Sequence, residues 1–164
     1  MPEAYRGEHT APTTESAPAS DLTSNGVYPA DVYTRPDWYE QDDGLAEMRK
    51  IQRLKGKPNS LVWIHRAVPL DVAEQAMKSG SPLNYVFRGG DWVTTSKQYA
   101  KDHGESALNG KYRVFSKRVK AKDIYTNGDS IFEWGYNPED KEKTTKKSTA
   151  KGNSSAIANA AKMK

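Results

Sequence analysis

LVWIHRAV, at residues 61–68, is the stretch that decides the fold, because it carries the clearest strand pattern in the chain. From Val62 to Val68 every second side chain is apolar except that of Arg66, and a strand places this series on one face. An arginine among apolar neighbours needs a partner, since an unpaired buried charge is very costly. Two interpretations of Arg66 follow. It forms a salt bridge that ties two strands together, or its guanidinium faces a cleft and clamps a phosphate or carboxylate.

The segments around this strand alternate between helical and extended patterns. Helices are predicted over 44–54 with Asp43 as the cap, after Pro69, and after Thr95 or Ser96, either of which can cap the helix. Further strands are predicted over 91–96, 111–119 and 130–136, with a loop over 80–90. This order predicts the α+β class, with a small mixed or antiparallel β core and short helices.

The length of 164 residues suits one domain flanked by polar segments. Residues 1–26 are rich in Ala, Pro, Thr and Ser and are predicted to form a flexible leader. Residues 27–138 are predicted to form a single α+β domain of catalytic type. Its first part, 27–43, combines four aromatic residues with prolines, which favours an irregular arm with its rings at the domain surface or edge. Residues 139–164 are predicted to be a disordered basic tail.

The net charge of +4 favours a nucleic-acid partner, but the position of the charge weakens that interpretation. Seven lysines and three acidic residues follow residue 138, so residues 1–138 are neutral overall. The tail is therefore expected to give weak nucleic-acid contact at most. The chain has no cysteine, which excludes a disulfide scaffold and a thiol nucleophile.

No segment has the apolar core of a signal peptide or the length of a transmembrane helix, and the mean hydropathy is −0.89. The sequence therefore predicts a soluble protein without membrane contact, located in the cytoplasm.

Glu133 lies in SIFEWGY, residues 130–136, with apolar residues on both sides. If this segment is a strand, Glu133 shares a face with Ile131 and Gly135, while the aromatic residues take the other face. A carboxylate in that place is an inward structural ion or a catalytic group. Gly135 has no side chain, so the strand is expected to leave room for a ligand beside the carboxylate.

Three hydroxyl residues, Thr94, Thr95 and Ser96, end the predicted strand over 91–96. Taken alone they are weak evidence, because Thr is common in strands and Ser is a common helix cap. Together with an inward Arg66 and an inward Glu133 they form a constellation on three strands.

The order of these residues resembles the Arg–Ser–Glu arrangement of ADP-ribosyltransferases. Three sequence segments are similar to the ADP-ribosyltransferase-like domains of phage and other mobile-element proteins: IHRAVP at 64–69, GDWVTTSKQYAKDHG at 90–104 and SIFEWGYNP at 130–138. The resemblance extends to YRGEHTAP at 5–12 and YPADVY at 28–33, and so covers about residues 5–138.

The resemblance implies that NAD is the substrate. It implies that Arg66 binds the dinucleotide, that Ser96, with Thr94 and Thr95, shapes the floor of the cleft, and that Glu133 orients the ribose next to nicotinamide. Tyr99 is a candidate ring for stacking on nicotinamide. Breaking the nicotinamide–ribose bond passes through an oxocarbenium-like centre, which a carboxylate stabilises without a metal.

The implied function is a mono-ADP-ribosyltransferase, a glycosyltransferase by class, or an NAD glycohydrolase. It would be phage-encoded and act on a host protein or nucleic acid in the host cytoplasm, after delivery with the virion or synthesis there. Arginine-modifying members carry an acid or Gln two residues before the catalytic Glu, where this chain has Ile131. This departure makes arginine a doubtful acceptor.

Two other functions remain open. A metal-independent ribonuclease would use His65 or His103 as acid, Glu133 or Glu105 as base, and Arg66 or Lys97 as phosphate clamps. Strand alternation places His65 away from Arg66 and Glu133, which counts against a shared site, and the three histidines show no metal-ligand spacing. A non-enzymatic module would bind a virion or host factor through the aromatic arm and the basic tail.

Overall fold

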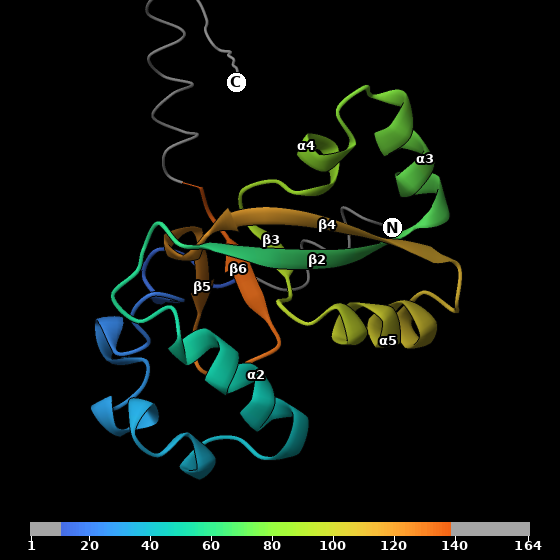
Figure 1. Cartoon of the computed structure of the whole chain (residues 1–164). Coiled ribbons are helices and arrows are strands. Elements are labelled where there is room, and N and C mark those ends of the chain that lie inside the picture. The colour runs from blue at the N-terminus through green and yellow to red at the C-terminus, as the bar shows by residue number, and fades with distance from the viewer. Residues whose placement is uncertain (1–10, 139–164) are drawn as a thin grey trace, which may run out of the picture.

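Two antiparallel sheets carry the fold in the computed structural model, which describes residues 11–138 (Figure 1). The first sheet has the strand order β1-β5-β6-β3, formed by Ala17–Pro18, Ile124–Thr126, Trp134–Tyr136 and Asp91–Val93. The second is a ribbon of two longer strands, β2 (Leu61–Pro69) and β4 (Tyr112–Lys120). The predicted α+β class with an antiparallel core is confirmed.

Short helices lie on both sides of the β2–β4 ribbon (Figure 1). α3 (Leu70–Lys78) and α4 (Pro82–Val86) lie on one side, and α5 (Lys97–Ala107) lies on the other. α2 (Asp42–Gln52) lies below the four-stranded sheet in this view. Residues 11–138 also contain the 3₁₀ turns η1 (Ser24–Gly26), η2 (Ala30–Tyr33), η3 (Pro36–Trp38) and η4 (Ala121–Asp123). Within residues 11–138 none of the helices has the length and apolar character needed to cross a membrane.

The two sheets are joined at a bridge between His65 of β2 and Thr94, just after β3. The His65 amide donates to the Thr94 carbonyl at 2.7 Å, and the Thr94 amide donates back at 3.0 Å. Continuing this antiparallel pairing by two residues would set Ala67 opposite Trp92, but both residues instead line a pocket. The split between β2 and β3 therefore creates the pocket in which the candidate site lies.

The prediction of a flexible leader is wrong for residues 11–26, which pack into the domain. Ala17, Ala19 and Leu22 are fully buried, and β1 pairs with β5. The Leu22 amide donates to the Tyr33 hydroxyl at 2.7 Å. The small side chains that make residues 11–26 look like a low-complexity segment allow this segment to pack closely against the neighbouring backbone. Residues 1–10 and the predicted tail at 139–164 lie outside the described residues.

The aromatic arm is only partly at the surface. Tyr28 is buried and packs edge-on against Tyr39, with ring centroids 5.8 Å apart. Trp38, by contrast, is 59% exposed and lies under the guanidinium of Arg35. Prolines and 3₁₀ turns give the arm the predicted irregular path, but one part of it contributes to the core.

Several predicted element bounds are shifted. α2 begins at Asp42 instead of after an Asp43 cap, and the preceding Gln41 makes no side-chain capping bond. The strand predicted over 91–96 is limited to β3 and the bridge at Thr94, and the strand predicted over 130–136 is limited to β6. The loop predicted over 80–90 contains α4. These differences matter for the site because its side chains lie next to the shortened strands.

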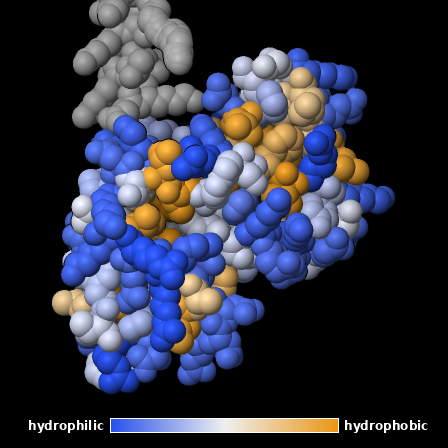
Figure 2. Space-filling view, in the orientation of Figure 1, coloured by the Kyte–Doolittle hydropathy of each residue, from blue (hydrophilic) through white to orange (hydrophobic). Residues whose placement is uncertain are grey.

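Exposed apolar side chains gather over α3 and α4 (Figure 2). Leu70 and Met77 of α3 are about half exposed, at 50% and 52%, and Leu83 of α4 is exposed too. This surface lies on the opposite side of the ribbon from α5, which carries part of the pocket (Figure 1).

Candidate active site

A pocket of about 260 Å³ lies where β2 separates from β3, closed on one side by α5 and on another by the turn before β6. Its polar lining combines residues from three regions that are distant in sequence: His65, Arg66, Thr94, Tyr99, His103 and Glu133. This volume is close to the lower end of small-molecule sites, so the pocket suits a small ligand or one part of a larger ligand. Four of these residues are among the predicted site residues.

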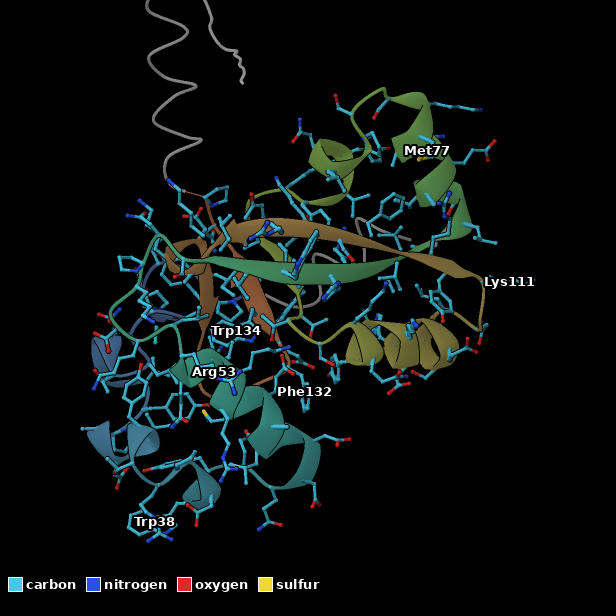
Figure 3. The ribbon with its side chains drawn as sticks, viewed as in Figure 1. Trp38, Arg53, Met77, Lys111, Phe132 and Trp134 are labelled. Atoms are coloured by element: carbon cyan, nitrogen blue, oxygen red, sulfur yellow. The ribbon has the colours of Figure 1, made fainter. Side chains whose placement is uncertain are left out.

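Glu133 lies in the pocket and accepts a hydrogen bond from the Tyr99 hydroxyl at 2.6 Å. The Tyr99 ring stacks on Phe132, with ring centroids 5.0 Å apart and planes 7° from parallel. Figure 3 shows Phe132 below the ribbon near the start of α5, and Trp134 closer to the ribbon. Tyr99 therefore fixes the carboxylate through its hydroxyl while its ring forms part of a flat apolar wall.

Strand alternation fails around Glu133 because residues 130–133 form a turn. The Glu133 amide donates to the Ser130 carbonyl at 3.3 Å, and the Phe132 amide donates to the Ser130 hydroxyl at 3.1 Å. Phe132 and Glu133 consequently both line the pocket, whereas Ile131 is fully buried in the core. The turn brings together two side chains that an extended strand would have separated.

The expected ligand space beside Gly135 is occupied by the chain itself. A Cβ built on Gly135 would overlap the backbone of Pro12, including its carbonyl oxygen. The same carbonyl accepts a hydrogen bond from the Asn137 side-chain amide at 3.0 Å. The prediction was wrong because the glycine accommodates the N-terminal segment and not a ligand.

Arg66 is 9% exposed and has structural partners as well as a place in the pocket lining. Its Nη1 donates to the Val86 carbonyl at 2.8 Å and lies 3.7 Å from the Asp91 carboxylate. The Asp91 carboxylate is therefore an ion partner of Arg66 in the structure. Arg66 ties β2 to β3 and α4, and it also gives the pocket a positive side.

The three predicted hydroxyl residues have different roles. Thr94 lines the pocket, and its hydroxyl accepts from the Ser96 amide at 3.1 Å. Thr95 points to α2, where its hydroxyl donates to the Glu47 carboxylate at 2.5 Å. Ser96 caps α5 by accepting from the Tyr99 amide at 3.1 Å. Thr95 and Ser96 are thus not part of the pocket lining; they anchor the helix that carries Tyr99.

Two histidines join the pocket, although neither was among the predicted substrate-binding residues. His65 contributes to the lining, but its Nδ1 lies 2.7 Å from the Ser116 hydroxyl on β4, whereas Arg66 donates to the Val86 carbonyl. The two side chains therefore leave β2 in different directions, as alternation predicted, although both residues line one pocket. The pocket follows the edge of β2 where pairing with β3 ends, so both faces of the strand contribute. His103 follows Tyr99 by four residues on α5, a spacing that places the two on one face of a helix and that the sequence already showed.

Burial lowers the pKa of both histidines below the ordinary value of 6.5. For His103, Glu133 opposes this effect and Arg66 adds to it; for His65, Lys50 and Lys97 lower the pKa further. The unfolded chain consequently binds more protons than the folded chain when the pH lies below about 6.5.

The stabilising effect of these two neutral histidines is expected to be complete above the unfolded pKa. It is then lost as the pH falls from about 6.5 through the folded pKa values. Urea unfolding of wild type between pH 7.5 and 5.5 measures this loss. The double variant His65→Gln, His103→Gln is expected to show a smaller dependence on pH. An equally steep dependence in the double variant would contradict the assignment.

No family model, curated protein or solved structure matches this chain. The chemistry of the site must therefore be argued from its own side chains. Within residues 11–138 no three His, Asp or Glu side chains are grouped as a metal site.

The pocket combines a carboxylate held by a tyrosine, a nearby guanidinium and a stacked aromatic wall. A carboxylate in a half-buried place stabilises positive charge that develops on a bound molecule, and a guanidinium stabilises an anionic part of the same molecule. The aromatic wall suits a planar ring. Such a site suits a molecule that combines a planar ring with an anionic group and develops positive charge near the carboxylate.

Proposed function

We propose that this chain is an NAD-dependent mono-ADP-ribosyltransferase or NAD glycohydrolase whose pocket takes the nicotinamide end of NAD. The observation that carries the proposal is the hydrogen bond from the Tyr99 hydroxyl to Glu133 in a pocket that Arg66 also lines. Arg66 and Glu133 are among the residues for which the sequence resemblance implies substrate contacts. Their meeting in one pocket, from segments 67 residues apart in sequence, supports it.

The arrangement of the sheets supports an ADP-ribosyltransferase-like fold as part of the same proposal. Two antiparallel sheets meet at the bridge between His65 and Thr94, and the pocket opens beside that bridge. The strand that carries Arg66 belongs to one sheet, and Glu133 directly precedes a strand of the other. Substrate held in the split would contact both sheets.

In the proposed reaction the bond between the ribose carbon and the nicotinamide nitrogen breaks, and its electron pair leaves with nicotinamide. Glu133 accepts a hydrogen bond from a ribose hydroxyl and stabilises the positive charge that develops on the sugar. Tyr99 orients the carboxylate, and the Tyr99–Phe132 stack supplies the apolar wall. Arg66 offsets the negative charge of the diphosphate, and an acceptor nucleophile completes the new bond to the ribose.

The acceptor in this proposal is a host protein or nucleic acid. The resemblance to phage and mobile-element proteins further suggests a phage-encoded protein that acts in the host cytoplasm, made there or delivered with the virion. The lysines after residue 138 would add weak contact with a nucleic acid. These parts of the proposal rest on the sequence resemblance and on charge.

A metal-independent ribonuclease is a second candidate, and one observation favours it. His65, His103, Arg66 and Glu133 line the same pocket, so a proton donor, a base and a phosphate clamp are brought together after all. The aromatic stack favours the NAD reaction over this alternative, because it supplies a wall for the leaving nicotinamide ring.

The test is incubation of the purified protein with NAD labelled in the nicotinamide and, separately, in the adenine, with and without host extract. Release of nicotinamide, with adenine label on a macromolecule or in free ADP-ribose, is the expected result. RNA cleavage in the absence of NAD, without nicotinamide release, would favour the ribonuclease. If neither reaction occurs, the chain is a binding module and the proposal is wrong.

Tyr99→Phe is expected to lower kcat for nicotinamide release by roughly 10-fold or more, because a hydrogen bond to a charged group contributes about 1.5–3 kcal/mol. The ring and its stack on Phe132 are retained, so the thermal midpoint should change little. Tyr112→Phe is the matched control, since the Tyr112 hydroxyl donates to Glu105 at 3.0 Å outside the pocket. Equal activity of both variants would contradict the role of Tyr99.

A further inference from the structure

His103 of α5 lines the pocket together with Tyr99, next to the proposed reaction centre. It follows Tyr99 by about one helical turn, so both side chains face the pocket from the same helix face. The next residue, Gly104, presses α5 onto β4: a Cβ there would overlap the ring of Tyr112. His103 is thus presented by a closely packed helix whose position is fixed at both ends, by the Ser96 cap and by this contact.

The charged surroundings of His103 differ from those of the other pocket histidine. His103 interacts electrostatically with Glu133, before β6, and with Arg66 on β2. His65 interacts with Lys50 and Lys97, and its Nδ1 is engaged with the Ser116 hydroxyl. Of the two imidazoles, His103 is therefore the one coupled to the carboxylate at the proposed reaction centre.

The environment of His103 suits a group that starts neutral and gains a proton. Burial, with Arg66 acting in the same direction, lowers its pKa, so the neutral imidazole dominates near pH 7. Glu133 acts in the opposite direction and stabilises the imidazolium once it forms. The other titratable groups that line the pocket are His65, Tyr99 and Glu133 itself.

Apart from Glu133, residues 131–133 of the turn before β6 contain no side chain that could remove a proton from the acceptor. Ile131 is apolar and fully buried, and Phe132 stacks on Tyr99. Glu133 is committed to Tyr99 and, in the proposed function, to the ribose. A group that handles the acceptor therefore has to come from another element, and α5 supplies one.

We propose that His103 is the general base that removes the proton from an oxygen acceptor, either water or the hydroxyl of a macromolecule. This inference rests on the proposed function. As the ribose–nicotinamide bond breaks and nicotinamide leaves with the electron pair, the acceptor oxygen forms the new bond to the ribose carbon. Its proton passes to the imidazole and is later released to solvent. The acceptor class follows from the base, because a neutral imidazole matches the removal of a proton from a hydroxyl or water near pH 7.

The experiment compares the full-length wild type with His103→Ala in the nicotinamide-release assay. General base catalysis contributes about 100- to 10,000-fold, so kcat is expected to fall at least about 100-fold while KM for NAD changes little. Added imidazole is expected to restore part of the lost rate, which a structural role would not allow. In the pH–rate profile, the wild-type rate should fall below the pKa of His103, and in the rescued variant this acidic limb should shift to the pKa of the added imidazole.

Two further variants keep the test decisive. His103→Gln preserves most of the side-chain volume and serves if the alanine variant does not fold, as judged by its thermal midpoint. His65→Gln is the matched histidine variant, and its rate is expected to keep the acidic limb. Activity of His103→Ala or His103→Gln equal to wild type overturns the assignment, as does loss without imidazole rescue in a folded variant.

The products identify the source of the acceptor oxygen. Free ADP-ribose marks water, whereas label on a macromolecule that resists neutral hydroxylamine marks a hydroxyl. Label that hydroxylamine releases would contradict an oxygen acceptor of this class. Absence of nicotinamide release by wild type refutes the proposed function and this inference together, whereas an active wild type with an unaffected His103 variant refutes only the inference.

Discussion

Glu133→Gln is expected to reduce nicotinamide release from NAD by at least about 100-fold, equivalent to about 2.7 kcal/mol of transition-state stabilisation. Glutamine keeps the size of the side chain and can still accept a hydrogen bond from Tyr99, but it has no negative charge. The charge matters because the sugar becomes positive only as the bond breaks. The loss should therefore appear in kcat, while the affinity for NAD, measured by calorimetry with a non-hydrolysable analogue, should change little.

Glu105→Gln is the matched control for this prediction. Glu105 is also a glutamate that accepts a hydrogen bond from a tyrosine hydroxyl, that of Tyr112, but it is exposed on α5 outside the pocket. Its activity is expected to equal that of wild type. A fully active Glu133→Gln protein would remove Glu133 from the reaction, and equal losses in both variants would indicate a general effect of charge.

Gly135→Ala is expected to destabilise the fold by about 3 kcal/mol, the upper part of the usual range for overpacking in a well-packed interior. The added methyl group would occupy the space of the Pro12 carbonyl, which is backbone and cannot rotate away. Moving it would also break the hydrogen bond from Asn137. Urea unfolding at pH 7.5 measures the loss, and the unfolding midpoint should shift without a large change in slope.

Gly89→Ala provides the comparison. A Cβ on Gly89 would lie 3.8 Å from the Pro138 ring, an ordinary contact, so this variant should stay within about 0.5 kcal/mol of wild type. If Gly135→Ala were as stable as Gly89→Ala, the N-terminal segment would not pack against β6 as described. The prediction therefore tests the packing of residues 11–19 as well as the glycine.

Local patterns in the sequence predicted the elements that depend on near neighbours. The alternation in residues 61–68 predicted β2 and the inward face of Arg66, because a long strand with one buried face repeats every two residues. Ser96 was one of the two residues predicted to cap α5, the other being Thr95, and it accepts a bond from the Tyr99 amide. In both cases the interactions lie within a few residues along the chain.

The same patterns failed where a distant segment decides the environment. The composition of residues 11–26 resembles that of a flexible leader, yet its small side chains are what allow close packing against β5 and β6. Alternation also did not reveal that His65 and Arg66 would line one pocket, because that pocket begins where the pairing of β2 with β3 stops. Neither feature leaves a periodic signal in the sequence.

By itself, the sequence determined the α+β class and the inward face of Arg66, since these follow from periodicity and residue type. Only the tertiary structure decided that Asp91 is an ion partner of Arg66, that Pro12 occupies the space at Gly135, and that His103 joins Glu133 in one pocket. Contacts between segments many residues apart depend on how the two sheets meet, and no local pattern encodes that geometry.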